Sequence, residues 1–434
     1  MPNALVLGAG IMGLSAAWGL ARAGFAVTVV EQDAVPNPRG ASVDEHRLIR
    51  HAYGPAAGYT RMVDEAYAAW ELLWADLGER LHVPTGVLAV ANGPEGWLAD
   101  SRATLTTQGH GFTDLTATEL AGRFPMLGTE GIGAALHLTS GGVLLAGRIV
   151  AALARHLRGR GVRFLRGRAI EADPARASLT LEDGTRHQAD RLVLAAGPWA
   201  PRLLPGLAGR VTPSRQIVVY VEPPAQHRAA WDVAPMLLDL SAQGGFYAVP
   251  PVAGTPLKIG DHRFSLQGDA EDPREASAAE AEAILTLARP RLRDAGAYRV
   301  LGARACYYDV EPEERFIVEP LGEQCIVMSG FSGHGFKFGA LLGLAVAAGN
   351  TGALASWAAG QGGRRPLGTP AGVTLSPRPR HPSSKSHAPH KKQAPSLRHP
   401  RIDNGGADAS SSPCHLSAVA GHRPGEARNH HPHQ

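Results

Sequence analysis

The N-terminal segment, residues 1–31, constrains the fold most strongly. Residues 4–13, ALVLGAGIMG, indicate a short apolar strand that runs into a turn containing Gly8, Gly10 and Gly13. Residues 14–24 have helical periodicity, and residues 25–31, FAVTVVE, indicate a second strand that ends in Glu31. A strand, a Gly-x-Gly-x-x-Gly turn, a helix and an acidic end to the next strand predict a dinucleotide-binding unit.

The chemistry of a dinucleotide explains this spacing. The glycines let the backbone approach a pyrophosphate, and the helix N-terminus turns unpaired N–H groups and a positive dipole end towards it. A carboxylate at the end of the second strand accepts hydrogen bonds from ribose hydroxyls and disfavours a 2′-phosphate. The alternative is a glycine-rich turn that serves packing alone. The candidate cofactor-binding residues here are Gly8, Gly10, Ile11, Met12, Gly13 and Glu31.

The position of the next suitable strand favours FAD over a nicotinamide cofactor. Residues 190–199, DRLVLAAGPW, form an apolar strand that ends at a turn with Gly197 and Trp199, far along the chain from Glu31. Nicotinamide enzymes usually continue as a compact run of strand–helix units. An interrupted nucleotide domain suits FAD better.

Length and cysteine content bound the class of protein. The 434 residues suffice for two domains with large cores. The three cysteines, Cys306, Cys325 and Cys414, form no disulfide framework, which favours a reducing, cytoplasmic compartment. No apolar run reaches membrane-spanning length without interruption, so no membrane association is expected.

The charge is divided unevenly along the chain. The net charge is +4, but residues 361–434 contain eleven Lys/Arg and three Asp/Glu, so residues 1–360 carry a net charge of −4. We therefore expect no nucleic-acid partner for the body. The tail has eleven Pro, nine His and no aromatic residue besides His, so we expect it to be disordered. A metal-binding or polyanion-binding tail is the alternative.

The remaining pattern predicts an α/β protein with two domains. Helices are expected at residues 59–80, 145–161 and 276–292, and alternating or aromatic strands at 213–265 predict a mixed sheet. The expected fold is an interrupted Rossmann-like FAD-binding domain of the glutathione-reductase type with a mixed-sheet substrate domain. The expected boundaries are 1–80, 142–212 and 305–360 for the FAD-binding domain, and 81–141 and 213–304 for the substrate domain.

Several motifs together resemble one family. They are GAGIMGLSAAW, HRLIRHAYG, FYAVPP, LKIGDH, CYYDVEPEERFIVEP and GFSGHGFKFG, in this order. The same order occurs in monomeric sarcosine oxidase and the related N-methyl amino acid oxidases of the D-amino-acid-oxidase-like FAD superfamily. The resemblance covers about residues 3–357, and the last motifs are more specific than the glycine turn.

The resemblance implies a role for Cys306 and two cations. A cysteine at the position of Cys306 forms a thioether with the flavin in that family, whereas composition alone favours an inert buried thiol. Arg50 and Lys337 resemble the residues that bind the substrate carboxylate, a task that suits a planar guanidinium fork and a point charge. Lys258 resembles the lysine that promotes the reaction with oxygen, since a positive charge stabilises developing superoxide. An ordinary edge-strand lysine is the alternative for Lys258.

Further site residues follow from the same resemblance. Tyr247, His262 and Tyr308 resemble residues that line the substrate pocket, although each could serve as core or rim. No metal is expected. The further candidate cofactor contacts are Arg47, Gly197, Trp199, Gly333, His334, Gly335 and Lys337.

Two departures from the family pattern leave the substrate open. Residues 42–45, Ser-Val-Asp-Glu, replace a His-rich run, and Asp261 stands in place of a tyrosine. We expect a monomeric FAD-dependent oxidase that converts a secondary or N-methylated amino acid to an imine and reduces oxygen to hydrogen peroxide. The alternatives are a dehydrogenase that uses a quinone or carrier, a flavoprotein subunit of a complex, and a nicotinamide enzyme.

Overall fold

A six-stranded sheet carries the glycine turn. The computed structural model describes residues 1–241 and 245–360, so the predicted tail and Cys414 lie outside the described residues. All neighbouring strands of this sheet are parallel except the β19–β20 pair. In spatial order, the strands are β19 (Ile317–Pro320), β20 (Cys325–Ser329), β13 (Arg191–Leu194), β1 (Asn3–Leu7), β2 (Ala26–Glu31) and β9 (Arg163–Arg166).

The interrupted sheet that the sequence predicts is confirmed. β13 lies directly beside β1, with Leu5 opposite Leu192 and Leu7 opposite Leu194, although ten strands and four α-helices separate β2 from β13 along the chain. Parallel strands buried on both faces are expected to be continuously apolar, as both of these strands are. The glycine turn and the turn after β13 therefore open at the same edge of the sheet.

Two helices cross closely enough to bring their first residues together. In α1 (Ile11–Arg22), a Cβ on Gly19 would lie 2.3 Å from the carbonyl oxygen of Gly343 in α9 (Gly339–Ala348). A Cβ on Gly339, the first residue of α9, would lie 2.7 Å from Ile11, the first residue of α1. Only glycine permits this contact, so the two helix N-termini lie close together. The other helices of this part are α2 (Ala57–Leu77), α5 (Ala146–Gly159), α6 (Ala200–Leu203) and α10 (Thr351–Ala358).

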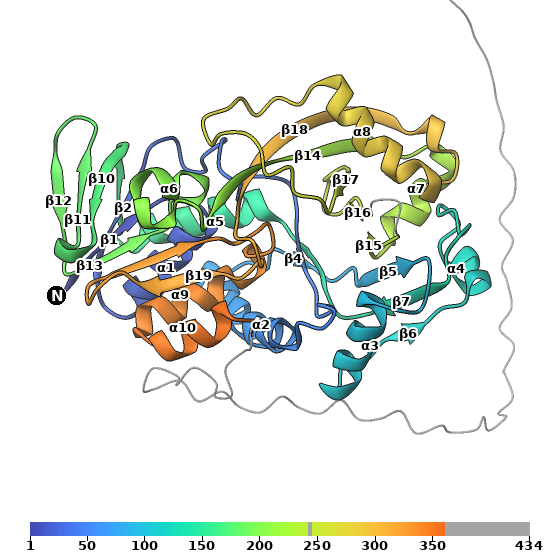
Figure 1. Cartoon of the computed structure of the whole chain (residues 1–434), viewed down its shortest axis with the longest axis horizontal. Helices are drawn as coiled ribbons and strands as arrows, with labels where there is room; N and C mark the ends of the chain where they lie inside the picture. Colours follow the sequence, from blue (N-terminus) through green and yellow to red (C-terminus); the bar gives the residue numbers. More distant parts are fainter. Residues whose placement is uncertain (242–244, 361–434) are drawn as a thin grey trace, which may run out of the picture. The chain divides into compact units, whose positions relative to one another are not determined.

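An eight-stranded mixed sheet forms the second layer. Figure 1 shows its long strands β14 and β18 running between the part that holds α6 and the part that holds α7 and α8. In spatial order, the strands are β18 (Arg299–Val310), β14 (Thr212–Glu222), β17 (Leu257–Asp261), β16 (Phe246–Val249), β15 (Met236–Asp239), β5 (Val87–Ala91), β7 (Ala134–Leu138) and β6 (Thr113–Asp114). The associated helices are α3 (Trp97–Thr107), α4 (Ala117–Arg123), α7 (Ala225–Asp232) and α8 (Ala278–Ala288).

The register of this sheet places four predicted site residues on one face. Cys306 lies opposite Gln216, and Lys258 lies opposite Tyr220, four residues further along β14. Side chains alternate between the two faces of a strand, so residues at even spacing share a face. By the same register, Tyr308 and Tyr247 lie on that face.

Two small sheets complete the described chain. One joins β3 (Arg47–Ile49), β8 (Gly142–Leu144) and β4 (His82–Val83), and the other is the antiparallel set β10 (Ala169–Asp173), β11 (Ser178–Leu181) and β12 (Arg186–Gln188). Strand β3 begins at Arg47 and ends one residue before Arg50, so its pairing with β8 fixes the chain between these two arginines. No helix in the part of the chain that the structure describes is long and apolar enough to span a membrane.

The predicted helices are found with shifted ends. The segments 145–161 and 276–292 contain α5 and α8, and the segment 59–80 overlaps α2, which begins two residues earlier at Ala57. Helix α8 begins at a capping box between Ser277 and Glu280 and ends at Ala288, before a short turn that contains Pro290. The boundaries between the FAD-binding and substrate domains stay a prediction.

Candidate active site

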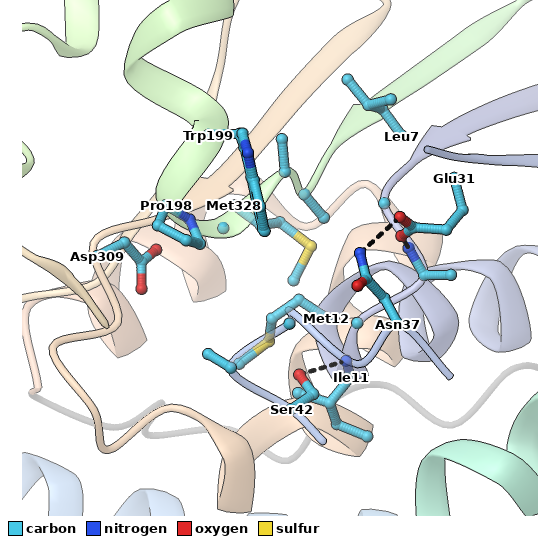
Figure 2. Close-up of a pocket in the computed structure, with 18 of the residues that line it drawn as sticks. Leu7, Ile11, Met12, Glu31, Asn37, Ser42, Pro198, Trp199, Asp309 and Met328 are labelled. Carbon is cyan, nitrogen blue, oxygen red and sulfur yellow. Dashed lines mark hydrogen bonds between the residues drawn. The ribbon is translucent and has the colours of Figure 1, made fainter. Parts of the chain in front are cut away.

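The first cavity lies at the edge of the six-stranded sheet. It has a volume of about 320 Å³ and opens between the N-terminus of α1, the end of β2 and the turn after β13. Figure 2 shows Glu31, Ile11 and Trp199 around this space. The predicted cofactor residues that line it are Gly8, Gly10, Ile11, Met12, Glu31, Arg47, Gly197, Trp199, Gly333 and Gly335.

Each of the three glycines in the turn has its own structural role. Gly8 has a φ of 99°, and a Cβ there would lie 2.3 Å from the carbonyl oxygen of Ala195. Gly13 does not line the cavity, but a Cβ on it would lie 1.9 Å from the carbonyl oxygen of Gly8, so it lets the helix pack on the strand. Gly10 is the N-cap of α1 and has no side chain of its own to cap this end. The positive end of the helix dipole therefore meets the cavity, where it would stabilise an anion.

Glu31 faces the same turn. Its carboxylate is buried and accepts hydrogen bonds from the N–H of Ala9 at 2.8 Å and the side-chain amide of Asn37 at 2.9 Å (Figure 2). Burial raises the pKa of Glu31, and these hydrogen bonds oppose that shift. Ser42 accepts a hydrogen bond from the N–H of Ile11 at 2.9 Å. Glu31 and the first residues of α1 thus line one cavity.

A second cavity adjoins the first. Its volume is about 170 Å³, and it shares Arg47, Tyr308, Gly333 and Phe336 with the first cavity. The structure brings His334 and Cys306 to this second cavity, not to the first. The predicted residues that line it are Arg47, Arg50, Tyr247, Lys258, His262, Cys306, Tyr308, Gly333, His334 and Lys337.

Arg50 and Lys337 form a cationic wall around one aromatic ring. The Arg50 guanidinium lies 4.4 Å and the Lys337 Nζ 5.4 Å from the ring centre of Tyr53. Both cations donate to backbone carbonyls, Arg50 to Ala52 and Lys337 to His334, the latter at 2.7 Å. Among the described residues, neither forms an ion pair with a carboxylate. Burial and mutual repulsion lower the pKa of Lys337 well below its usual value.

Lys258 has a different environment. Its Nζ lies 2.8 Å from a carboxylate oxygen of Asp44 and 2.9 Å from the carbonyl oxygen of His46. Burial lowers the pKa of Lys258, and Asp44 opposes this effect. Lys258 and Lys337 are the only lysines in residues 1–360, and both are buried against the second cavity.

Cys306 is a free, buried thiol on this wall. Burial raises its pKa, and the positive charge of Arg47 acts in the opposite direction. The ring of Tyr308 packs where a Cβ on Gly333 would stand, at 2.3 Å. Cys325 is also buried, but it lies in the apolar core beside β13, where burial raises its pKa to about 12.

Sequence reasoning missed the partners of these residues. Asn37 donates a hydrogen bond to Glu31, Ser42 accepts one from Ile11 beside the glycine turn, and Tyr220 donates one to Asp44. In the sequence, Asp44 is only one of several charged residues within residues 40–54. No short-range signal indicates its pairing with Lys258, because 214 residues separate the two.

One group of metal-ligand side chains lies elsewhere. Ligand atoms of His51, Asp64 and His110 lie within 4.8 Å of one another. The Asp64 carboxylate is mostly exposed, and His51 hydrogen-bonds it at 3.2 Å, so hydrogen bonding accounts for the arrangement. The expectation that no metal is bound stays a prediction.

Comparison with known proteins decides the family. Residues 3–348 match the family described as FAD dependent oxidoreductase. The chain belongs to this family. The resemblance inferred from the motifs is therefore confirmed at the level of the family, and the protein is an FAD-dependent oxidoreductase.

Relatives of this FAD-dependent oxidoreductase include amino acid oxidases. N-methyl-L-tryptophan oxidase of Yersinia pestis (strain Pestoides F) is 28% identical over 347 residues, covering 78% of this chain and 92% of the relative. NikD, described as an unusual amino acid oxidase essential for nikkomycin biosynthesis, is 21% identical with a TM-score of 0.68 and covers 80% of this chain and 93% of its own. L-proline dehydrogenase from P. horikoshii is 20% identical with the same TM-score of 0.68, covering 81% and 93%. These two structures support the predicted fold class.

The residues present fit FAD. The first cavity combines the N-terminus of α1 for a pyrophosphate with a buried carboxylate for ribose hydroxyls. The adjoining second cavity leaves room beside it for the reactive end of the cofactor and a small substrate. Residues from both cavities would hold the cofactor, with Gly8, Gly10 and Glu31 at the nucleotide end.

Proposed function

We propose that this FAD-dependent oxidoreductase oxidises a secondary or N-methylated amino acid to an imine and reduces oxygen to hydrogen peroxide. In the balanced reaction, the donor C–H and N–H lose two electrons and two protons, and oxygen gains them. The imine then hydrolyses in water. When bound, FAD accepts the electron pair from the donor and passes it to oxygen. The relative named N-methyl-L-tryptophan oxidase supports this substrate class.

The pair of cations without a carboxylate partner carries the proposal. Keeping Lys337 buried beside the half-buried Arg50, with no ion pair to either among the described residues, costs stability, so a functional reason is expected. A substrate carboxylate would provide the missing charge, with the Arg50 fork and the Lys337 point charge as its two contacts. Because the two cations hold the carboxylate at one wall, they orient the amine of the same molecule relative to the rest of the cavity.

Other residues that line the second cavity have further proposed roles. Tyr247 and Tyr308 bound the cavity on the sheet side, His262 bounds it at the end of β17, and their rings exclude water from the reacting bond. Lys258 provides a buried positive charge that favours oxygen reduction. Cys306 would attach the cofactor covalently, and the nearby Arg47 charge favours the thiolate that this attachment requires.

Peroxide detection tests the proposal. The purified full-length protein is incubated in air with N-methylated amino acids and with the matching amines that lack a carboxylate. We expect stoichiometric peroxide with the acids and none with the amines. Turnover only when an artificial quinone is added would favour a dehydrogenase instead. A colourless preparation without bound flavin would contradict the proposed cofactor use.

A further inference from the structure

A buried carboxylate lies between the two cations nearest to Cys306. Asp44 is buried in the segment before β3, and its Oδ2 accepts hydrogen bonds from Lys258 at 2.8 Å and from Arg47. Its Oδ1 accepts from the hydroxyl of Tyr220 and from the N–H of Glu45, the latter at 2.7 Å. Four donors thus converge on one carboxylate, which lines the second cavity together with Lys258 and Arg47.

The positions of the two cations do not depend on Asp44 alone. Lys258 also donates to the carbonyl oxygen of His46 at 2.9 Å. Arg47 also donates to the carbonyl oxygens of His46, at 2.6 Å, and Ala41. Carbonyl oxygens supply geometry but no full charge. The distinct contribution of Asp44 is therefore its negative charge.

The charge balance at this wall differs from that at the opposite wall. Lys258 and Arg47 face one carboxylate, which leaves a net charge of +1. Arg50 and Lys337 form no ion pair among the described residues, and the only carboxylate whose charge acts on this pair is Glu314, which acts on Arg50. The two lysines of residues 1–360 thus differ, because Lys258 has a counter-ion and Lys337 has none among the described residues.

We propose that Asp44 is the counter-ion that keeps Lys258 protonated at the cavity wall and thereby fixes the charge that this wall presents to the reacting groups. Asp44 is a positioning residue, since it acts through Lys258. The consequence for oxygen reduction rests on the proposed function, but the ionisation of Lys258 does not. A constant charge makes the oxygen step insensitive to pH near neutrality.

The other groups around Lys258 do not replace Asp44. Burial and the neighbouring cations lower the pKa of His46 to about 3, so it is neutral. Burial raises the pKa of the surrounding tyrosines and of the cysteine, so these groups are neutral as well. Arg47 is cationic and opposes protonation of Lys258. The titratable groups that face Lys258 are Asp44, His46, Arg47, Tyr220, Tyr247, Cys306 and Tyr308.

The ionisation of Lys258 can be measured directly. The chain has only five lysines, so NMR of the holoenzyme labelled with ¹³Cε-lysine gives few resonances, and Lys258→Met assigns the relevant one. We expect Asp44→Asn to lower the titration midpoint of Lys258 by about 1 to 3 pH units, because an adjacent opposite charge shifts a pKa by this amount. Asp44→Glu, which keeps the charge, should restore most of the midpoint. The same midpoint in wild type and D44N would overturn the proposal.

The wild-type protein provides a test without any substitution at Asp44. Lys258 should titrate at a higher pH than Lys337, which has no counter-ion, once Lys337→Met has assigned the second resonance. Lys258 titrating at or below Lys337 would contradict the counter-ion role. This comparison holds even if D44N does not fold.

The oxygen step gives the functional readout. We expect the rate constant for the reaction of the reduced holoenzyme with oxygen to fall about tenfold in D44N as the pH rises through the lowered Lys258 midpoint, and to stay flat in wild type. Asp239→Asn is the matched control, because Asp239 is a buried carboxylate paired with Arg291 at 2.7 Å and lines neither cavity. A D44N profile as flat as those of wild type and D239N would overturn the role at Lys258. Wild type that retains flavin but does not react with oxygen would instead contradict the proposed function.

Discussion

Replacing Lys337 with methionine should stabilise the fold and weaken substrate binding. The Lys337 side chain is buried, and its pKa lies well below the usual value because of burial and the nearby Arg50 charge. The unfolded chain holds the same lysine protonated up to about pH 10.4. The loss of stability therefore grows as the pH falls from that value to the folded pKa, and it is complete below the folded pKa. Methionine keeps a similar length and volume without the charge.

The contacts of Lys337 give an approximate size for the stability gain and for the loss of affinity. Replacing buried charges with apolar groups of similar size often raises the free energy of unfolding by about 1 to 4 kcal/mol. The lost hydrogen bond to the His334 carbonyl offsets about 1 kcal/mol of this gain. A hydrogen bond to a charged group contributes about 1.5 to 3 kcal/mol, so carboxylate affinity should fall roughly 10- to 150-fold.

Two assays on the Lys337→Met variant test the expected gain in stability and the expected loss of carboxylate affinity. Urea unfolding at neutral pH gives the stability, and titration with a carboxylate inhibitor, followed in the visible spectrum of the flavin, gives the affinity. Arg291→Met is the matched control, because Arg291 is a buried cation with a carboxylate partner, and its loss should destabilise the fold by about 3 to 5 kcal/mol. A destabilised K337M with unchanged carboxylate affinity would refute the reasoning.

Three further predictions concern the cofactor and the pH dependence of stability. In Cys306→Ala, acid precipitation should leave the flavin in the supernatant, whereas wild type should carry it into the pellet; flavin in the wild-type supernatant would reduce Cys306 to a packing residue. In the Cys306→Ala background, Glu31→Gln should weaken FAD binding about 10- to 100-fold by equilibrium dialysis, since one charged acceptor of the ribose hydroxyls is lost, and unchanged retention would remove that role. Burial raises the pKa of Asp309 to about 6, so its ionisation should cost about 3 kcal/mol of stability as the pH rises from about 4 to above 6, and Asp309→Asn should abolish this loss in urea unfolding at the two pH values. Equal pH slopes for wild type and D309N would contradict that assignment.

The local parts of the fold were predictable from the sequence. The strand–turn–helix with Gly8 and Glu31 follows from backbone geometry and hydrophobic periodicity within one short N-terminal segment. The adjacency of residues 190–199 to the first strand was also predictable, because only an apolar strand suits the centre of a parallel sheet. The end of α8 was not, since the predicted segment continued beyond Ala288 to residue 292.

The charge balance of the candidate site was not predictable from short-range pattern. Motifs located Lys258, Arg50 and Lys337, but nothing in the chain near the two lysines indicates that Lys258 has a counter-ion and that Lys337 has none among the described residues. That difference depends on tertiary pairing between Asp44 and β17. Likewise, the close crossing of Gly19 and Gly343, which sets the two helix N-termini side by side, joins the first and the ninth α-helix of the described chain.

Anaerobic reduction of the bound flavin tests the central claim most directly. The holoenzyme is mixed without oxygen with an N-methylated amino acid, with its methyl ester and with the amine that lacks the carboxyl group, and the visible absorbance is followed. We expect rapid bleaching by the acid and at least tenfold slower bleaching by the two analogues without a carboxylate, since only the acid neutralises Arg50 and Lys337. Equal bleaching by all three compounds, or bleaching by none of a panel of secondary amino acids, would contradict it.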